Sequence, residues 1–193
     1  AELGSLSLTV DEQQYLTDLS LSLDQTSTLD LENERFEFTE GTFSIRGLAL
    51  NLTGSLSNWS STPLLSLQFE SSSDNFGELL RLAPPQYDEY LSSLETRGAL
   101  LFEGTVDGEL AEGSYPRFDV VLGVTDGFLQ NPDLPEAIQN IDFRILLNND
   151  LATVEQFSAE AGVNRITASG TVERPLDSDA IFSLELDGDV DLA

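Results

Sequence analysis

The residues with the most evident potential for chemistry are carboxylates near the end of the chain. Asp187-Gly188-Asp189-Val190-Asp191 is similar to the start of an oxygen-rich Ca²⁺ loop, where aspartates at alternate positions supply ligands. The bidentate Glu that completes an EF-hand loop is missing, and the aspartates alternate with Leu186, Val190 and Leu192. This alternation favours a strand with one solvated face over a calcium site.

Other catalytic and modification signals are weak. Asn51-Leu52-Thr53 and Asn58-Trp59-Ser60 match the N-glycosylation pattern, but so short a pattern often arises by chance and Asn51 falls in an expected strand. The 35 Asp and Glu residues offer pairs for glycoside hydrolysis, yet none lies in an aromatic-rich segment that would bind sugar. The chain has no His and no Cys, which excludes a Ser-His-Asp triad, a thiol nucleophile and the usual zinc sites. We therefore expect no enzyme, and neither a metal ion nor a cofactor.

Charge limits the partners and indicates the surroundings. The eight basic residues are all arginines, lysine is absent, and the net charge is −27 in 193 residues. Such a chain is repelled by phosphate backbones, so we expect no nucleic-acid binding. Self-repulsion of carboxylates destabilises a compact state in dilute buffer, but at about 1 M salt the Debye length is only about 3 Å. The composition therefore predicts a halophilic protein, with an ordinary acidic secreted domain as the alternative.

The elements that would position any site are strands. Apolar residues alternate with polar ones throughout, and turn signals separate the alternating segments. Strands are expected around 19–23, 29–31, 36–38, 43–52, 65–69, 99–106, 118–124, 141–147, 154–159, 166–172 and 181–192. Turns are expected at Glu40-Gly41, Asp107-Gly108, Glu112-Gly113, Asp126-Gly127, Asn148-Asn149-Asp150 and Arg174-Pro175. Short connections of this kind predict an antiparallel meander, because parallel strands need long crossovers. No apolar run is long enough to span a membrane as a helix.

One stretch departs from the alternation. Apolar residues from Asp74 to Leu82 recur at helical spacing, with Ser73 or Asp74 as the expected N-cap and Pro84-Pro85 as the end. Tyr87, Tyr90, Leu91 and Leu94 predict a second short helix. We expect this helical insert, at about residues 74–94, to cover an open end of the sheet. The alternative, a helix lying on a membrane, is disfavoured because its polar face is acidic rather than basic.

Three strands end on a common pattern of Gly, then Ser or Thr, then an apolar residue. The copies contain Gly54, Gly104 and Gly170, and Gly188 begins a looser fourth. Glycine within a strand marks a bulge, a bend or a close approach of two backbones. Bends repeated across a broad sheet would curl it. The expected fold is therefore mainly β: a large curved antiparallel meander, an open groove or half-barrel, with one or two short helices near 74–94.

From about Leu31 to Ala193 the order of segments resembles the AsmA family of bacterial envelope proteins, in the form of the C-terminal region of Bacteroidota-type members. Its most specific part is the Pro132-Asp133-Leu134-Pro135 segment after a Gly-Phe strand. The matching segments are residues 43–54 (FSIRGLALNLTG), 76–84 (FGELLRLAP) with Tyr87, 96–104 (TRGALLFEG), 116–118 (PRF), 127–135 (GFLQNPDLP) with Ile138, Asn140 and Ile141, and 170–192. On this resemblance Gly54, Gly104, Pro132, Pro135 and Gly170 are structural motif residues.

The resemblance implies a single AsmA-like β domain over 1–193, cut from a longer periplasmic chain that an inner-membrane anchor outside this segment holds in place. The absence of Met, even at position 1, agrees with an excised segment. Members of this family, and the related TamB-like proteins, are associated with outer-membrane biogenesis and are thought to conduct phospholipid along an apolar β-groove. The implied partners are phospholipid or acyl chains and outer-membrane assembly proteins.

Three functions stay open at this stage. The first is lipid handling along an apolar groove, in which each buried methylene is worth about 0.8 kcal/mol. The second is a structural or protein-interaction module of the envelope without lipid cargo, and the third is a secreted Ca²⁺- or sugar-binding β-sandwich. The residues proposed to line a groove are apolar strand and helix positions: Leu19, Leu21, Leu23, Leu48, Leu50, Leu52, Phe76 and Leu80. The competing interpretation is that they form the core of a sandwich.

Overall fold

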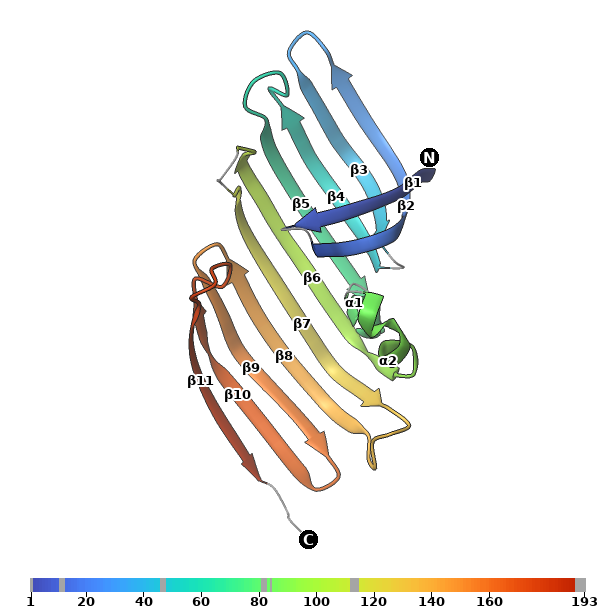
Figure 1. Cartoon of the computed structure of the whole chain (residues 1–193), viewed down its shortest axis with the longest axis vertical. Helices are drawn as coiled ribbons and strands as arrows, with labels where there is room; N and C mark the ends of the chain where they lie inside the picture. The colour runs from blue at the N-terminus through green and yellow to red at the C-terminus, as the bar shows by residue number, and fades with distance from the viewer. Residues whose placement is uncertain are drawn as a thin grey trace. The chain divides into compact units, whose positions relative to one another are not determined.

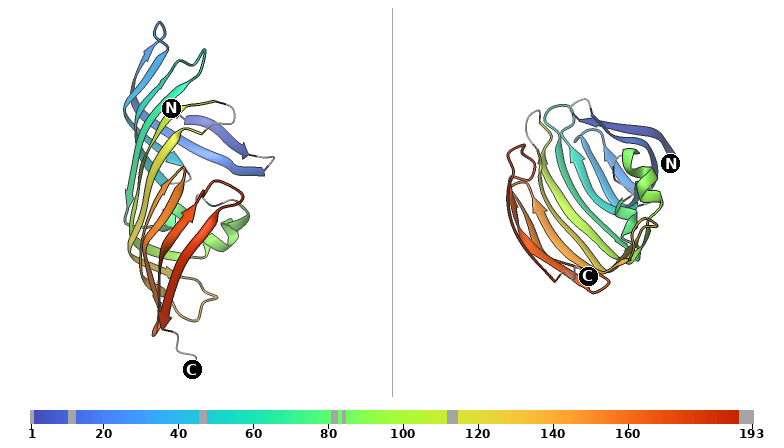
Figure 2. Two further views of the ribbon diagram at one scale, coloured as in Figure 1. Left: turned by 90° about the vertical axis from the view of Figure 1, so that its left-hand side faces the viewer. Right: turned by 60° about the horizontal axis from the view of Figure 1, so that its bottom comes forward.

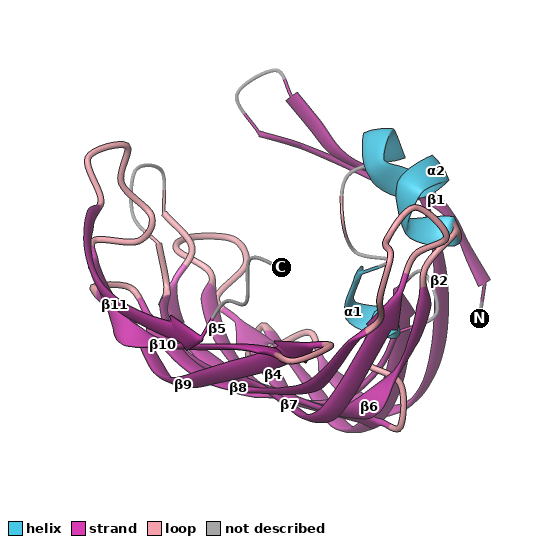
Figure 3. Ribbon diagram, turned by 90° about the horizontal axis from the view of Figure 1, so that it is seen from below, coloured by secondary structure: helices cyan, strands magenta, loops and turns pink. Residues whose placement is uncertain are grey.

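A computed structural model describes residues 2–10, 13–45, 48–80, 83, 85–111 and 115–189; the side chains of residues 2–25, 45, 72 and 85 lie outside this description. Strand is the dominant element, and helix is confined to short segments (Figure 3). The strands are β1 (Glu2–Val10), β2 (Gln13–Asp30), β3 (Arg35–Ile45), β4 (Leu48–Ser57), β5 (Leu64–Ser73), β6 (Glu95–Glu109), β7 (Arg117–Gln130), β8 (Ile138–Asn148), β9 (Leu151–Ala161), β10 (Asn164–Glu173) and β11 (Ile181–Asp189). The helices are α1 (Gly77–Leu80), a 3₁₀ turn at Pro85–Tyr87, and α2 (Asp88–Ser92).

The described strands follow one another in chain order. Hydrogen-bonded neighbours run from β1 to β11 without a crossover, and the order is open because β1 and β11 stand at its two ends (Figure 1). Every strand pair with a resolved register is antiparallel. The prediction of a mainly β, antiparallel and open meander with short helices near 74–94 is confirmed. No helix in the described ranges has the length and apolar character needed to cross a membrane.

Contacts divide the chain into two compact units. The first unit comprises Ala1–Ser71, Glu78–Glu89 and Gly104–Phe118, and the second comprises Ser72–Gly77, Tyr90–Glu103 and Asp119–Ala193. The first unit contains β1 to β4 and most of β5, together with the end of β6, whose Asp107 carboxylate accepts a 2.6 Å hydrogen bond from the Ser66 hydroxyl. The second unit contains β8 to β11 and most of β7.

Three of the expected turns are wrong, and a fourth lies outside the described residues. Glu40-Gly41 lies inside β3, Asp107-Gly108 inside β6 and Asp126-Gly127 inside β7, whereas Glu112-Gly113 falls on residues that the structure does not describe. Glycine beside an acidic residue interrupts the ladder at two of these places without ending the strand, since the register shifts between Phe38 and Thr42 and between Val124 and Gly127. The turns at Asn148–Asp150 and Arg174-Pro175 are confirmed.

β-bulges in three consecutive strands keep apolar side chains on one face of the second unit and polar side chains on the other. In β7, Val124 pairs with Phe143 and Gly127 pairs with Ile141. β7 therefore contains one residue more than β8 between these two pairs. β8 does the same between Ile138 and Ile141, and β9 between Val154 and Phe157. Such a bulge shifts the alternation of side chains by one position. The shift places each polar pair on one face of the sheet: Thr125-Asp126, Gln139-Asn140 and Glu155-Gln156.

The capping residue of the helical insert lies one or two residues later than expected. Asn75, rather than Ser73 or Asp74, holds the start of α1, because its Oδ1 accepts hydrogen bonds from the Gly77 amide (2.9 Å) and the Thr96 hydroxyl (2.8 Å). The Ser73 hydroxyl in turn accepts a 3.1 Å hydrogen bond from the Asn75 amide. Phe76 is tied to β6 by its amide, which donates to the Gly98 carbonyl at 2.9 Å. These bonds fix Phe76 in the second unit.

Two of the repeated glycines are required by their backbone. Gly54 has φ 145° and Gly170 has φ 147°, a region that residues with a side chain rarely adopt. A Cβ on Gly170 would collide with the Ser183 carbonyl of β11, and a Cβ on Gly54 would collide with the Ser66 carbonyl of β5. Both glycines therefore permit the close approach of neighbouring strands, as the repeated pattern predicts.

Candidate functional site

The second unit presents a face that is apolar along three rows of paired residues. Residues directly opposite each other in an antiparallel pair share a face, so the register defines rows across β7 to β11. The rows are Val120–Leu147–Ala152–Val172–Phe182, Leu122–Ile145–Val154–Gly170–Leu184 and Val124–Phe143–Phe157–Ala168–Leu186. No polar side chain interrupts these three rows. We call them the apolar face.

The apolar face is most exposed at β11. Val124 of β7 is 2% exposed, whereas Leu186, in the same row on β11, is 73% exposed. Phe182 and Leu184 of β11 are also exposed. β9, β10 and β11 lie side by side in Figure 1 and in both views of Figure 2. Within the described part of the chain, the apolar face is therefore packed at Val124 of β7, half-buried across β8 to β10 and exposed at β11.

A cavity of about 380 Å³ opens on the apolar face. Phe76, only 6% exposed, forms one wall, and the other apolar walls come from β7 to β10. The lining side chains are Phe76, Leu129, Ile138, Ile141, Phe157, Ala159, Ala161 and Ile166, with Glu160 and Asn164 at the rim. Gly188 stands opposite Ile166 and so adds no side chain there. The volume lies in the range of about 300–1,000 Å³ that is usual for sites of small ligands.

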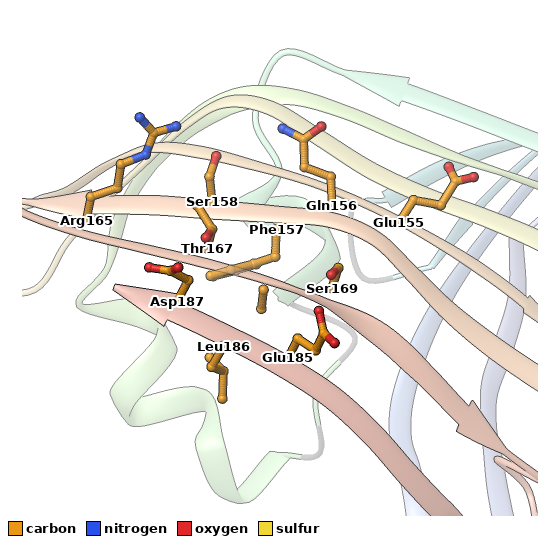
Figure 4. A pocket seen from close by; sticks show the side chains of 11 residues that line it. Glu155, Gln156, Phe157, Ser158, Arg165, Thr167, Ser169, Glu185, Leu186 and Asp187 are labelled. Carbon is orange, nitrogen blue, oxygen red and sulfur yellow. The ribbon is translucent and has the colours of Figure 1, made fainter. Parts of the chain in front are cut away.

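The opposite face of the same strands is polar and carries a wider hollow of about 660 Å³. Its polar side chains come from β9, β10 and β11 (Figure 4). They are Glu155, Gln156, Ser158, Arg165, Thr167, Ser169, Glu185 and Asp187. Glu155 and Gln156 project to the same side in Figure 4 while Phe157 points to the other, as the bulge requires. The prediction that acids occupy the solvated alternate positions is confirmed for these strands.

Two arginines form ion pairs with carboxylates on this polar face. The Arg144 Nε lies 3.0 Å from Glu155 Oε2, and the Arg165 Nε lies 3.9 Å from Glu160 Oε1. All four side chains are partly exposed, so each pair contributes at most about 1 kcal/mol. No such pair involves Glu185, Asp187 or Asp189 in the described structure. Among the described residues, no group of three or more acidic side chains is placed to hold a metal ion.

The eight residues proposed to line a groove fall into three groups. Leu19, Leu21 and Leu23 belong to β2, but their side chains lie outside the described part. Leu48, Leu50 and Leu52 share one face of β4, where they pair with Ile45, Phe43 and Phe69 in the first unit. Leu48 is fully buried, and Leu80 is half-buried in α1. Among those of the eight whose side chains are described, Phe76 alone lines the apolar cavity of the second unit.

The other walls of the cavity were not among the proposed residues. Ile141, Phe157 and Ile166 lie in segments that the alternation identifies as strands, but alternation does not say which strand positions stay uncovered. A usable signal is the pattern apolar–polar–polar–apolar at Ile138–Ile141 and Val154–Phe157, which marks a bulge. Of the motif residues, Gly104 lies inside β6, and Pro132 and Pro135 lie in the connection from β7 to β8.

That connection is built on a turn anchored by a buried amide. Asn131 is 1% exposed; its carbonyl accepts from the Leu134 amide at 3.0 Å, and its Oδ1 accepts from the Asp133 amide at 2.8 Å. Pro132 occupies the second position of this turn, which its fixed φ suits. The Pro132–Pro135 segment thus has a structural role at the end of β7.

Comparison of the chain with models of protein families, with curated proteins and with solved structures gave no match. The resemblance to the AsmA family rests on the motifs of the sequence alone.

Proposed function

We propose that this chain is a non-enzymatic lipid-handling segment that binds an acyl chain in the cavity on the apolar face of its second unit. The observation that supports this most directly is the cavity of about 380 Å³ lined by Phe76 and by apolar side chains of β7 to β10. A cavity with this lining suits a hydrocarbon chain, because it offers dispersion contacts and few groups for polar recognition.

The energetics of such binding need no head-group contact. Each methylene removed from water contributes about 0.8 kcal/mol, so several methylenes together offset the entropy lost on association. From exposed Ile166 in the cavity lining, Leu184 and Leu186 continue the apolar surface along β11. A long chain can therefore extend from the cavity along the uncovered part of the face.

The resemblance of the sequence to the AsmA family supports the wider setting of this proposal. On that basis the segment works in the bacterial periplasm, attached to the inner membrane through a part of its parent chain, and serves outer-membrane biogenesis. Its cargo is phospholipid or a related acyl lipid. The acidic, lysine-free composition supports a high-salt habitat.

The test compares a cavity-filling variant with a matched variant on the polar face. Ala159→Phe places a ring in the cavity, whereas Thr167→Phe adds a ring on the polar face of the neighbouring strand. The ligand is a fluorescent monoacylglycerol, which carries no charge and is not repelled by the acidic chain. Anisotropy at 2 M NaCl measures its affinity, and native mass spectrometry of untreated protein detects lipid that co-purifies.

We expect the natural chain to bind the probe and to carry lipid. Ala159→Phe should weaken binding about tenfold or more, since excluding two methylenes removes about 1.6 kcal/mol. Thr167→Phe should leave binding unchanged. No binding by the natural chain, or equal binding by Ala159→Phe with its fold intact by circular dichroism, would refute the proposal.

A further inference from the structure

The first unit contains two N-glycosylation patterns, and the fold places them in unlike surroundings. Asn51-Leu52-Thr53 lies within β4, whereas Asn58-Trp59-Ser60 begins the connection from β4 to β5. In Figure 1 this connection is the teal loop beside the blue loop that joins β2 to β3. An acceptor asparagine has to reach an enzyme, so glycosylation sites fall on surface loops. Position in the fold therefore distinguishes the two patterns, which look alike in the sequence.

Asn51 is held by neighbours on both sides of β4. It pairs in register with Thr42 of β3 and with Glu70 of β5, and its Oδ1 accepts a 3.4 Å hydrogen bond from the Thr42 hydroxyl. Thr53, the other polar residue of the pattern, pairs with Gln68 of β5. In an extended strand, alternate residues are held about 6.5 Å apart. The Asn51 and Thr53 side chains therefore cannot turn toward each other while the ladder is intact.

Asn58 lies in an exposed turn whose backbone is fixed. Its φ of 56° is a left-handed conformation that asparagine tolerates. The Asn58 amide donates to the Glu34 carbonyl at 3.0 Å, and the Asn58 carbonyl accepts from the Ser61 amide at 3.1 Å. The Ser60 amide donates to Glu34 Oε2 at 3.2 Å. These bonds hold the turn against the β2–β3 connection.

The side chains of this turn are open to solvent. Asn58 and Ser60 are both exposed, and neither side chain forms a hydrogen bond with any part of the chain that the structure describes. Trp59, the single tryptophan of the chain, is half-buried between them. The carboxamide and the hydroxyl that the pattern requires are thus presented together on a fixed backbone.

From this arrangement we infer that Asn58 is a site of N-glycosylation on the folded chain and that Asn51 is not. The Asn58 side-chain nitrogen forms a bond to the anomeric carbon of a sugar carried on a lipid-linked phosphate, and the bond from that carbon to the phosphate oxygen breaks. The phosphate leaves with the bonding electrons, and a base of the transferring enzyme takes the proton from the nitrogen. The Ser60 hydroxyl supplies a second contact to that enzyme.

The inference needs export from the cytoplasm, which the proposed envelope setting supplies, and it does not depend on acyl-chain binding. A glycan on the β4–β5 turn is bulky and hydrophilic, and such groups are tolerated at exposed loop tips. Attached to Asn51 it would instead stand on the face of β4 and compete with the hydrogen bond from Thr42.

The experiment isolates the chain from the cells that produce it and locates the glycan by mass spectrometry. Trypsin cleaves after Arg46 and Arg81, so one peptide, residues 47–81, contains both patterns. Electron-transfer fragmentation leaves a glycan on its side chain and separates Asn51 from Asn58. The variants Asn58→Gln, Ser60→Ala and Ser60→Thr, with the matched control Asn51→Gln, are produced in the same cells. Trp59 fluorescence reports whether each variant keeps the turn.

The natural chain should carry a glycan on Asn58 and none on Asn51. Asn58→Gln and Ser60→Ala should lose it, whereas Ser60→Thr, which keeps a hydroxyl, and Asn51→Gln should retain it. An unmodified Asn58 in the natural chain would overturn the inference. A glycan on Asn51 as well would overturn it too, because transfer would then precede folding.

Retention of the glycan in Ser60→Ala would also count against the inference, since the pattern would then play no part. None of the substituted residues lines the apolar cavity. Each variant should therefore bind the monoacylglycerol probe as the natural chain does, so the two proposals fail separately.

Discussion

Leu186 of β11 stands directly opposite Ala168 of β10, yet 73% of Leu186 is exposed. The same row begins at Val124 of β7, which is 2% exposed. A single apolar row therefore passes from a packed core to open surface within one sheet. Burial, and not residue type, decides what each of these side chains contributes to stability.

The first prediction concerns this contrast. Leu100→Ala and Leu186→Ala remove the same atoms from two residues of the second unit that are 3% and 73% exposed. Leu100→Ala should lower the free energy of unfolding by about 2–5 kcal/mol, whereas Leu186→Ala should change it by no more than about 0.5 kcal/mol. Urea unfolding at fixed salt measures both. A comparable loss in the two variants would show that a covering element protects Leu186.

The second prediction concerns the backbone at Gly170. Its φ of 147° and the nearby Ser183 carbonyl leave no room for a side chain. Gly170→Ala should reduce the free energy of unfolding by about 1–3 kcal/mol or more through strain. Gly123→Ala is the control, because its Cβ would meet the Phe143 carbonyl at 3.4 Å and its φ is not in the positive range. The two variants should differ in their urea midpoints; equal midpoints would contradict the close approach of β10 and β11.

The third prediction concerns the pKa of Asp30, the last residue of β2 before the turn to β3. The Asn33 side chain, which donates to Asp30 Oδ2 at 2.7 Å, is the main cause that lowers this pKa, and the Asn33 and Glu32 amides also lower it. A pKa lowered by folding stabilises the fold above the unfolded value, and that contribution is lost as the pH falls through the folded pKa.

Asn33→Ala should therefore raise the pKa of Asp30 toward its ordinary value. Carboxyl chemical shifts in an NMR titration measure it directly. Asn51→Ala, at the other end of the β3–β4 pair, is the control and should leave Asp30 as it is. An unchanged titration of Asp30 in Asn33→Ala would mean that the turn amides alone hold the carboxylate.

The fourth prediction concerns salt. A net charge of −27 with eight arginines leaves most carboxylates without a partner, so their repulsion opposes folding at low ionic strength. The melting temperature should rise clearly between about 0.05 and 2 M NaCl, where the Debye length falls below about 3 Å. Sucrose at matched osmolality serves as the control, because it does not screen charge. A melting temperature that responds equally to both would argue against the halophilic interpretation.

Much of the fold follows from the order of residues. Strict alternation, as in Ile166-Thr167-Ala168-Ser169, predicts strands with one apolar and one polar side, and the short connections predict their antiparallel order. Asn148–Asp150 and Arg174-Pro175 identify real turns, because their side chains and φ preferences act locally. Asp126-Gly127 misleads for a related reason: the same dipeptide suits a turn and a bulge, and only the pairing with β8 distinguishes them.

The sequence by itself determined that the chain is a β protein with separated apolar and acidic faces, and that its side chains leave few routes to catalysis. These are properties of residue type and local spacing. The tertiary structure decided the rest. Bulges at Asp126, Asn140 and Glu155 bring Ile141 and Phe157 onto one face. The hydrogen bond from the Phe76 amide to the Gly98 carbonyl of β6 places Phe76 in the wall of the cavity there, while Leu186 of β11 stays 73% exposed. The burial of each apolar side chain depends on which distant segments pack against it, and no local sequence pattern carries that information.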